Sequence, residues 1–158
     1  MSWQVRPITA GDIDAVLELA EITPEAPHWQ RSEYECFGRL DESQLVRAGF
    51  VAVEEDRLLG FCMGTLVAGI CELESVAVAA DARRRGVATA LLQELLRWAQ
   101  SRQAVRLELE VRDSNYRAIR FYEKSGLACE GIRPNYYRSP DEDAVLMGMA
   151  LANGGKNA

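Results

Sequence analysis

The sequence is short of the residues that build metal centres and hydrolytic triads. It contains a single histidine, His28, and its four cysteines, Cys36, Cys62, Cys71 and Cys129, include no CxxC pair. Zinc sites need closely spaced Cys and His ligands, so we expect reduced thiols and no bound metal. With one histidine and no G-x-S-x-G elbow, the chain also does not fit a Ser-His-Asp hydrolase.

Long apolar stretches and an excess of basic residues are missing as well. No stretch approaches the ~18 apolar residues that a membrane span requires, and the segment MSWQVRPITAGDIDAV lacks the pattern of a signal peptide. Lys and Arg number 18 against 24 Asp and Glu, for a net charge of -6. Nucleic-acid-binding domains usually carry a basic surface instead. We therefore expect a cytoplasmic protein that binds neither membranes nor nucleic acids.

The composition of the chain is typical of one globular domain. Of its 158 residues, 48% are hydrophobic and 27% are charged, which is enough to bury a core. No repeat, linker or low-complexity segment interrupts residues 1–152, and we predict a single domain there. The end of the chain, NGGKNA at 153–158, is expected to be a disordered C-terminal tail.

The hydrophobic periodicity changes several times and predicts a mixed α/β or α+β domain. Alternating or continuous apolar runs indicate strands over 3–8, 50–54, 58–67, 71–79, 105–112, 127–132 and 144–151. The turn EEDR would join the second and third of these strands as a hairpin. Helical spacing predicts one helix that begins after Thr9 or Asp12, and others over 32–40, 87–101 and 116–124.

The segment DARRRGVATALLQELL places three arginines, Arg83 to Arg85, directly before a predicted helix. A helix N-terminus carries partial positive charge and disfavours cations. A strand, a turn, a glycine and a helix form a common phosphate-binding arrangement, in which Gly86 would permit close approach of the backbone. Neither a Walker loop nor a G-x-G-x-x-G fingerprint is present. The residues alone leave two interpretations, an anion site or a solvated basic turn.

Glu110 and Tyr122 are candidate catalytic side chains. Glu110 falls on the polar face of the predicted strand 105–112, near the end where catalytic groups often project into a crevice. Paired with Arg106 or Arg112, it would instead be a surface carboxylate. Tyr122 falls on the next helix, where a tyrosine usually packs in the core with its hydroxyl at the rim. Residue type alone does not decide between the catalytic and the structural roles.

Taken in order, several stretches of the second half resemble the GCN5-related N-acetyltransferase (GNAT) superfamily. They are VAV followed by R-x-x-G-x-A (Arg83, Gly86, Ala88), then LEVRDSN, AIRFYEKSGL and IRPNYYRSPDEDAVLM. Within the superfamily the sequence is most similar to the RimI group of ribosomal-protein-alanine N-acetyltransferases, through LEVR, NYY and EDA. The resemblance implies the GNAT fold, a mixed and mostly antiparallel sheet of about six or seven strands flanked by about four helices.

The resemblance also implies an acetyl-CoA-dependent transferase and suggests roles for residues of this chain. The strand carrying Val76, Ala77 and Val78 would pair with the pantetheine arm, and the N–H of Val76 would stabilise an oxyanion. Glu110 would be the general base and Tyr122 the general acid. Asn115 matches a further cofactor-binding position. The pyrophosphate would be held by the turn Arg83, Arg84, Arg85, Gly86, Val87, Ala88 and Thr89.

The acceptor side of the site is less well defined by the resemblance. Tyr136 and Tyr137 match the substrate-binding loop of the family, either as peptide contacts or as packing residues. Glu74 is a candidate auxiliary base or a structural carboxylate. The segment EAPHWQRSEYE departs from the family pattern by the inserted His28, which is a candidate acceptor-side group or a surface imidazole.

Amine chemistry bears on the class of acceptor. Only a neutral amine attacks a thioester, and at pH 7 roughly a tenth of an α-amino group is neutral, against less than about one part in a thousand of a lysine. One glutamate is therefore an adequate base for an N-terminal amine. This chemistry favours a protein N-terminus as the acceptor, and the resemblance to the RimI group implies the N-terminal alanine of a small-subunit ribosomal protein. The alternatives are a small amine or an internal lysine, or a non-catalytic acetyl-CoA-binding module.

Overall fold

The computed structural model of the chain describes residues 2–24, 26, 30–35 and 46–152. The predictions for His28, for the thiol of Cys36 and for the tail at 153–158 lie outside these ranges. The same holds for the end of the helix that was expected over 32–40.

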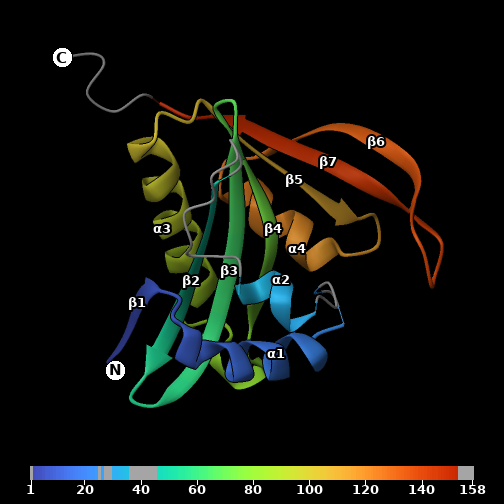
Figure 1. Cartoon of the computed structure of the whole chain (residues 1–158). Coiled ribbons are helices and arrows are strands. Elements are labelled where there is room, and N and C mark those ends of the chain that lie inside the picture. The colour runs from blue at the N-terminus through green and yellow to red at the C-terminus, as the bar shows by residue number, and fades with distance from the viewer. Residues whose placement is uncertain (1, 25, 27–29, 36–45, 153–158) are drawn as a thin grey trace.

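A seven-stranded sheet forms the centre of the described structure (Figure 1). Its strands lie in the order β1-β2-β3-β4-β5-β7-β6, with β4 and β5 parallel and the other neighbouring pairs antiparallel. The expected mixed, mostly antiparallel sheet is therefore confirmed. The strand bounds are β1 (Trp3–Pro7), β2 (Val46–Glu54), β3 (Arg57–Val67), β4 (Ile70–Val78), β5 (Arg106–Arg112), β6 (Ala128–Tyr137) and β7 (Glu142–Ala150).

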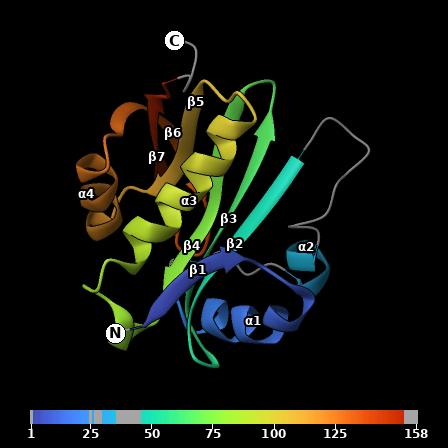
Figure 2. The same cartoon turned by 90° about the vertical axis from the view of Figure 1, so that its left-hand side faces the viewer.

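Helices cover both faces of the sheet (Figures 1 and 2). On one face, α3 and α4 bury a core cluster that includes Leu91, Leu95 and Tyr122. On the other face, α1 and α2 bury a second cluster that includes Val16 and Tyr34. No helix in the described part of the chain is long and apolar enough to span a membrane. The helix bounds are α1 (Ile13–Glu21), α2 (Arg31–Glu35), α3 (Val87–Ser101) and α4 (Tyr116–Lys124), with short 3-10 turns at Ala10–Asp12 and Ala80–Ala82.

Strands β4 and β5 are paired over only three residues and then separate. Their parallel ladder runs from Ile70 opposite Arg106 to Glu72 opposite Glu108, and Figure 1 shows the strands diverging beyond it. Within the described ranges, residues 73–78 of β4 have no strand partner on this side, while β3 pairs with the other edge. Backbone N–H and C=O groups along the open edge are therefore left for a ligand.

An irregularity in β4 changes which side chains face each side of the sheet. Ser75 of β4 pairs with Met63 of β3, and Leu73 pairs with the next residue of β3, Gly64. Glu74 lies between Ser75 and Leu73 and therefore has no pairing partner of its own in β3. Leu73 belongs to the core under α3, whereas Met63 belongs to the core under α1. A β-bulge of this kind re-aims side chains. It turns Ser75 to the α1 side of the sheet.

The predicted helices over 87–101 and 116–124 form with those bounds. The strand expected over 127–132 instead continues to Tyr137, past Pro134. A proline has no N–H to donate and is tolerated where a strand forms the edge of a sheet. Strand β6 is such an edge, and its ladder with β7 is irregular between Arg133 and Tyr137.

Candidate active site

A groove of about 860 Å³ opens where β4 and β5 separate. Its walls come from β4, the turn before α3, the end of β5 and α4. Two predicted site residues, Arg85 and Tyr136, are not among its lining residues. The other predicted site residues line it: Val76, Ala77, Val78, Arg83, Arg84, Gly86, Val87, Ala88, Thr89, Glu110, Asn115, Tyr122 and Tyr137.

The turn before α3 presents backbone N–H groups to this groove. Gly86 is the N-cap of α3 and has a left-handed φ of 82°. A Cβ at Gly86 would meet nothing within 4 Å, so the glycine is required by its φ and not by crowding. The first N–H groups of a helix have no partner within it and carry partial positive charge. The arrangement therefore suits a phosphate group.

The three arginines of the turn have different surroundings. Arg83 and Arg84 line the groove. Arg85 instead pairs with Glu54 at the end of β2, with Nη2 3.0 Å from Oε2. This contact lowers the pKa of Glu54. The side chain of Arg85 thus already has an anionic partner within the protein.

A basic face of α4, which was not predicted from the sequence, also lines the groove. Arg117, Arg120 and Lys124 recur three and four residues apart, which places them on one side of the helix. That spacing is visible in the sequence and was sufficient to identify them. At the start of α4, Asn115 acts as the N-cap through Oδ1, which accepts a hydrogen bond from the N–H of Ala118 at 3.2 Å. Together with the turn before α3, this face suits a polyanionic ligand.

Glu110 projects from β5 into the groove and is paired with an arginine that was not predicted. Its Oε2 lies 3.2 Å from Nη1 of Arg133, and its side chain is 17% exposed. The two partners considered from the sequence are engaged elsewhere, since Arg106 pairs with Glu108 and Arg112 pairs with Glu142. The interpretation of Glu110 as a carboxylate held by Arg106 or Arg112 is therefore wrong.

Tyr122 lies in the core between α4 and the sheet and reaches the same groove. It is 6% exposed, and its ring lies against Phe121 with 5.3 Å between the centroids. Burial raises the pKa of the Tyr122 hydroxyl above its ordinary value. The hydroxyl thus stays protonated across the physiological pH range, as a proton donor requires.

Tyr136 and Tyr137 stand at the end of β6 with their rings edge to face, 5.0 Å between centroids. Burial and the charge of Glu110 raise the pKa of Tyr137 to about 12. Burial and a hydrogen bond with Glu110 raise the pKa of Tyr136. Both tyrosines are therefore neighbours of Glu110, although Tyr137 alone lines the groove.

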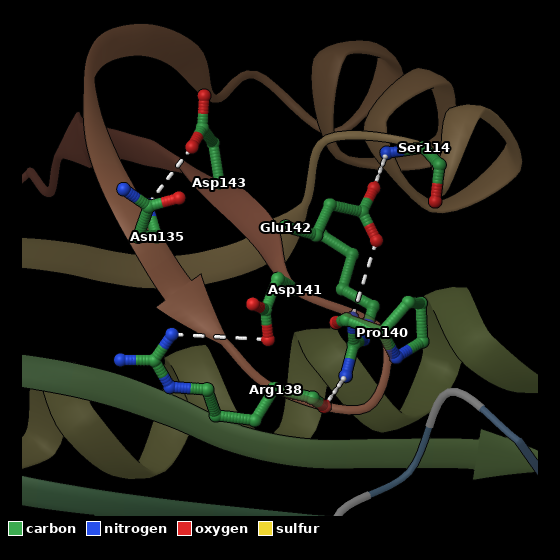
Figure 3. A network of polar contacts seen from close by, with 8 residues as sticks. Ser114, Asn135, Arg138, Pro140, Asp141, Glu142 and Asp143 are labelled. Atoms are coloured by element: carbon green, nitrogen blue, oxygen red, sulfur yellow. Dashed lines mark hydrogen bonds and ion pairs between the residues drawn. The ribbon is translucent and has the colours of Figure 1, made fainter.

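A polar network fixes the turn that follows these tyrosines (Figure 3). Arg112 donates hydrogen bonds to the carbonyls of Arg138 and Pro140 and pairs with Glu142 at 3.2 Å. Glu142 also accepts a hydrogen bond from the N–H of Ser114, just before α4. The network ties the turn between β6 and β7 to β5 and α4. It thereby holds the tyrosine pair beside the groove.

Two carboxylates of β4 lie in or next to the groove, Glu74 among its lining residues and Glu72 close to Glu74 and Glu110. Glu74 lines the groove, and its Oε2 accepts a hydrogen bond from Oγ1 of Thr65 at 3.1 Å. Glu72 was not predicted as a site residue, although the sequence shows that Leu73 separates it from Glu74, as alternation along a strand requires for two side chains on one face. Burial, followed by the charges of Glu74 and Glu110, raises the pKa of Glu72 to about 7. Burial and the neighbouring carboxylates therefore both disfavour the charged form of Glu72.

The chain is similar to known acetyltransferases in sequence and in fold. The model of the acetyltransferase (GNAT) family matches residues 13–127. A putative ribosomal protein bS18-alanine N-acetyltransferase of Bacillus subtilis is 30% identical over 148 residues, which cover 93% of this chain and 95% of that protein. The ribosomal protein bS18-alanine N-acetyltransferase of Salmonella typhimurium is 34% identical over 134 residues, covering 84% and 88%.

Among solved structures, the ribosomal-protein-S18-alanine N-acetyltransferase from Escherichia coli has a TM-score of 0.82 with this chain at 26% identity. The superposition covers 99% of each chain. The family match over residues 13–127 and the relatives at 30% and 34% identity confirm the resemblance seen in the motifs. The chain belongs to the acetyltransferase (GNAT) family.

Proposed function

We propose that this acetyltransferase transfers the acetyl group of acetyl-CoA to the N-terminal α-amine of a protein. The acceptor we propose is the N-terminal alanine of a small-subunit ribosomal protein. One observation carries the proposal: a single groove is lined by a basic helix N-terminus, by the open edge of β4, and by Glu110 and Tyr122. These are the parts that an acetyl transfer from a CoA thioester to an amine requires.

The groove has the chemistry to hold acetyl-CoA. CoA carries several phosphate charges, and the lining includes the N-terminus of α3 together with Arg83, Arg84 and the basic face of α4. The open edge of β4 at Val76 to Val78 offers N–H and C=O groups to the amide-rich pantetheine arm. When bound, acetyl-CoA supplies an acetyl group already activated as a thioester.

Glu110 is the proposed general base. An ammonium has no lone pair for attack, so its proton must leave first. Glu110 lies in the groove with its carboxylate beside the tyrosine pair of β6. It can accept the proton directly or through one water molecule.

The remaining steps need a donor for developing negative charge and a proton for the leaving sulfur. The N–H of Val76, on the open edge of β4, is the proposed donor to the carbonyl oxygen. The buried hydroxyl of Tyr122 is the proposed general acid, because Tyr122 lines the groove and a tyrosine hydroxyl is protonated at physiological pH. No covalent intermediate with the protein is needed.

The choice of an α-amine rests on its pKa and on the relatives. An α-amine titrates at about 7.7–8.0, whereas a lysine titrates near 10.4, so one carboxylate suffices for the former. Relatives that this chain matches over most of its length are named for the alanine of ribosomal protein bS18. These two observations favour an N-terminal alanine over a small amine or an internal lysine.

The test compares initial rates on two peptides of one sequence. One peptide has a free N-terminal alanine, and the other is blocked at its N-terminus and offers only a lysine. We expect the free N-terminus to be acetylated at least about a hundredfold faster in kcat/KM, in line with the difference in neutral amine. A preference for the blocked lysine peptide would overturn the proposal.

A further inference from the structure

Four carboxylates stand on one face of β4 and β5. Glu72 and Glu108 face each other at the end of the parallel ladder, and Glu74 and Glu110 follow them where the strands separate. The intervening leucines of both strands belong to the core under α3. Because side chains alternate along a strand, Glu72, Glu108 and Glu110 lie on the opposite face. The hydrogen bond of Glu74 with Thr65, the register partner of Glu72, places it on that face too.

Among the described residues, only two of these carboxylates have a cation beside them. Glu108 pairs with Arg106 at 3.1 Å and Glu110 pairs with Arg133 at 3.2 Å. Across 2–24, 26, 30–35 and 46–152, neither Glu72 nor Glu74 forms an ion pair, and Thr65 gives Glu74 a neutral partner. Arg47 of β2 pairs with Thr65 of β3, which in turn pairs with Glu72, so a strand separates Arg47 from Glu72. Arg47 also has an interaction partner of its own. Burial, and after it the charges of Glu74 and Glu110, raises the pKa of Glu72.

A second, independent observation marks the same place. The bulge turns Ser75 to the α1 side of the sheet, where it lines the groove next to Glu74. Ser75 is 5% exposed, and within the described structure its Oγ has no hydrogen-bond partner. Buried hydroxyls are nearly always hydrogen-bonded, and one left without a partner costs stability. A polar group of a bound ligand would supply the missing partner after a rotation about the Cα–Cβ bond.

The chemistry of this carboxylate cluster favours an organic cation as its ligand. Among the described residues, no three carboxyl, thiol or imidazole groups are arranged to hold a metal ion. From standard strand spacings, the Cα atoms of Glu72 and Glu110 are about 8 Å apart. That separation is spanned by two to three residues of an extended peptide, at about 3.3–3.6 Å each. A peptide whose amine reaches Glu110 thus brings its next side chains to Glu72 and Glu74.

We propose that Glu72 and Glu74 form a subsite for a basic side chain at the second or third residue of the acceptor, while the Ser75 hydroxyl hydrogen-bonds its main chain. This assignment rests on the proposed function, because it takes the acceptor to be a peptide with a free N-terminus. It names a substrate class, N-termini followed closely by arginine or lysine.

The test uses pairs of peptides that differ in one atom of one side chain. Each pair carries arginine or its neutral isostere citrulline at position two or three, behind the same N-terminal alanine. For the wild-type enzyme we expect kcat/KM to favour arginine about tenfold at one of these positions, with the ratio falling as salt is added. Wild-type ratios within twofold at both positions would overturn the subsite, and this measurement needs no variant.

Substitutions then show which side chains cause the preference for arginine over citrulline. In Glu72→Gln and Glu74→Gln the ratio should fall toward one, whereas Glu94→Gln, on α3 at the far face of the sheet, makes the same charge change and should keep the wild-type ratio. Ser75→Ala should raise KM for both peptides several-fold while the melting temperature stays the same or rises. A ratio unchanged in Glu72→Gln and Glu74→Gln would contradict the assignment.

Binding measurements distinguish a failure of the subsite from a failure of the proposed function. N-terminally acetylated versions of the same peptides cannot accept an acetyl group, but they still present the arginine or citrulline. Calorimetry should show tighter binding of the arginine peptide even if no N-terminus is acetylated, in which case the proposed function fails and the subsite stands. Equal binding, together with acetylation of both free peptides at equal rates, removes the subsite and leaves the proposed function intact.

Discussion

Nη1 of Arg133 lies 3.2 Å from Oε2 of Glu110, and the Arg133 guanidinium carbon is 4.8 Å from the centre of the Tyr136 ring. The proposed base of an amine acetyltransferase is therefore already paired with a cation of its own chain. An incoming ammonium and Arg133 compete for the same carboxylate. Because the Arg133 side chain is 54% exposed, it can swing into solvent when the acceptor binds.

Replacing Arg133 should strengthen acceptor binding. In Arg133→Gln the carboxylate of Glu110 is free, and we expect KM for a cationic acceptor peptide to fall about 1.5- to 5-fold, the range that exposed ion pairs contribute. Steady-state kinetics at fixed, saturating acetyl-CoA measure it. Arg138→Gln is the matched control, because Arg138 is also an exposed arginine but pairs with Asp141 in the turn. An unchanged or raised KM in Arg133→Gln would refute the competition.

The proposed base and acid should be separable from cofactor binding. Glu110→Gln and Tyr122→Phe keep the shape of the groove and remove the groups that move protons. We expect each to lower kcat about 10²- to 10⁴-fold, the usual contribution of a general acid or base. The dissociation constant for acetyl-CoA, measured by calorimetry, should change less than about threefold. Full turnover in both variants would remove these two roles from the mechanism.

Gly86 should be intolerant of a side chain for a backbone reason. A left-handed φ of 82° costs an L-residue about 1–2 kcal/mol, so Gly86→Ala should lose about that much unfolding free energy and raise KM for acetyl-CoA. Gly131→Ala is the control, since Gly131 has no positive φ and its new Cβ would only touch Leu146 at 3.6 Å. Urea unfolding of both variants gives the comparison. Equal losses would show that φ is not the cause.

The carboxylate of Glu72 should make the protein less stable as pH rises. Its pKa is about 7 in the folded chain and near 4.3 in an unfolded one, so between these values the folded state binds more protons. The free energy of unfolding therefore falls as pH rises from about 4.5 to 7. Glu72→Gln lacks this effect, and its stability relative to wild type should increase across that window. Urea unfolding at pH 5 and pH 8 measures it.

Asp12 provides a control in the same protein, because its pKa is shifted in the opposite direction. Asp12 accepts hydrogen bonds from Arg6 and from Thr9, and the Arg6 bond lowers the pKa of Asp12. Its contribution is present above the unfolded pKa of about 3.9 and is lost as pH falls below it. Asp12→Asn should thus be less stable than wild type at both pH 5 and pH 8. If Glu72→Gln showed the same pattern, the raised pKa would be wrong.

The elements with a clean hydrophobic period were predictable from sequence. In α3 the buried residues Val87, Leu91 and Leu95 recur every four positions, and in β5 apolar residues alternate with charged ones. The bounds of both elements were therefore predicted to within one residue. The groove residues on local motifs, such as Gly86 and Asn115, were also identified. Their signals lie in short stretches of chain, where spacing alone decides which side chains share a face.

The features that were missed depend on contacts between distant segments. The parallel pairing of β4 with β5 ends after three residues, and the bulge at Glu74 exists only relative to β3. Neither leaves a local mark in the sequence. The partner of Glu110 came from β6, 23 positions away along the chain and beyond the strand predicted over 127–132. Register and sheet order, set by the whole fold, decide such pairs.

The acceptor that we propose is an N-terminal α-amine. The most direct measurement uses one peptide that carries both a free N-terminal alanine and an internal lysine, incubated with the enzyme and acetyl-CoA. Fragmentation mass spectrometry then locates the added acetyl group in a single reaction. We predict that it lies on the alanine nitrogen in nearly all of the product, and acetylation of the lysine side chain with the α-amine left free would contradict the account.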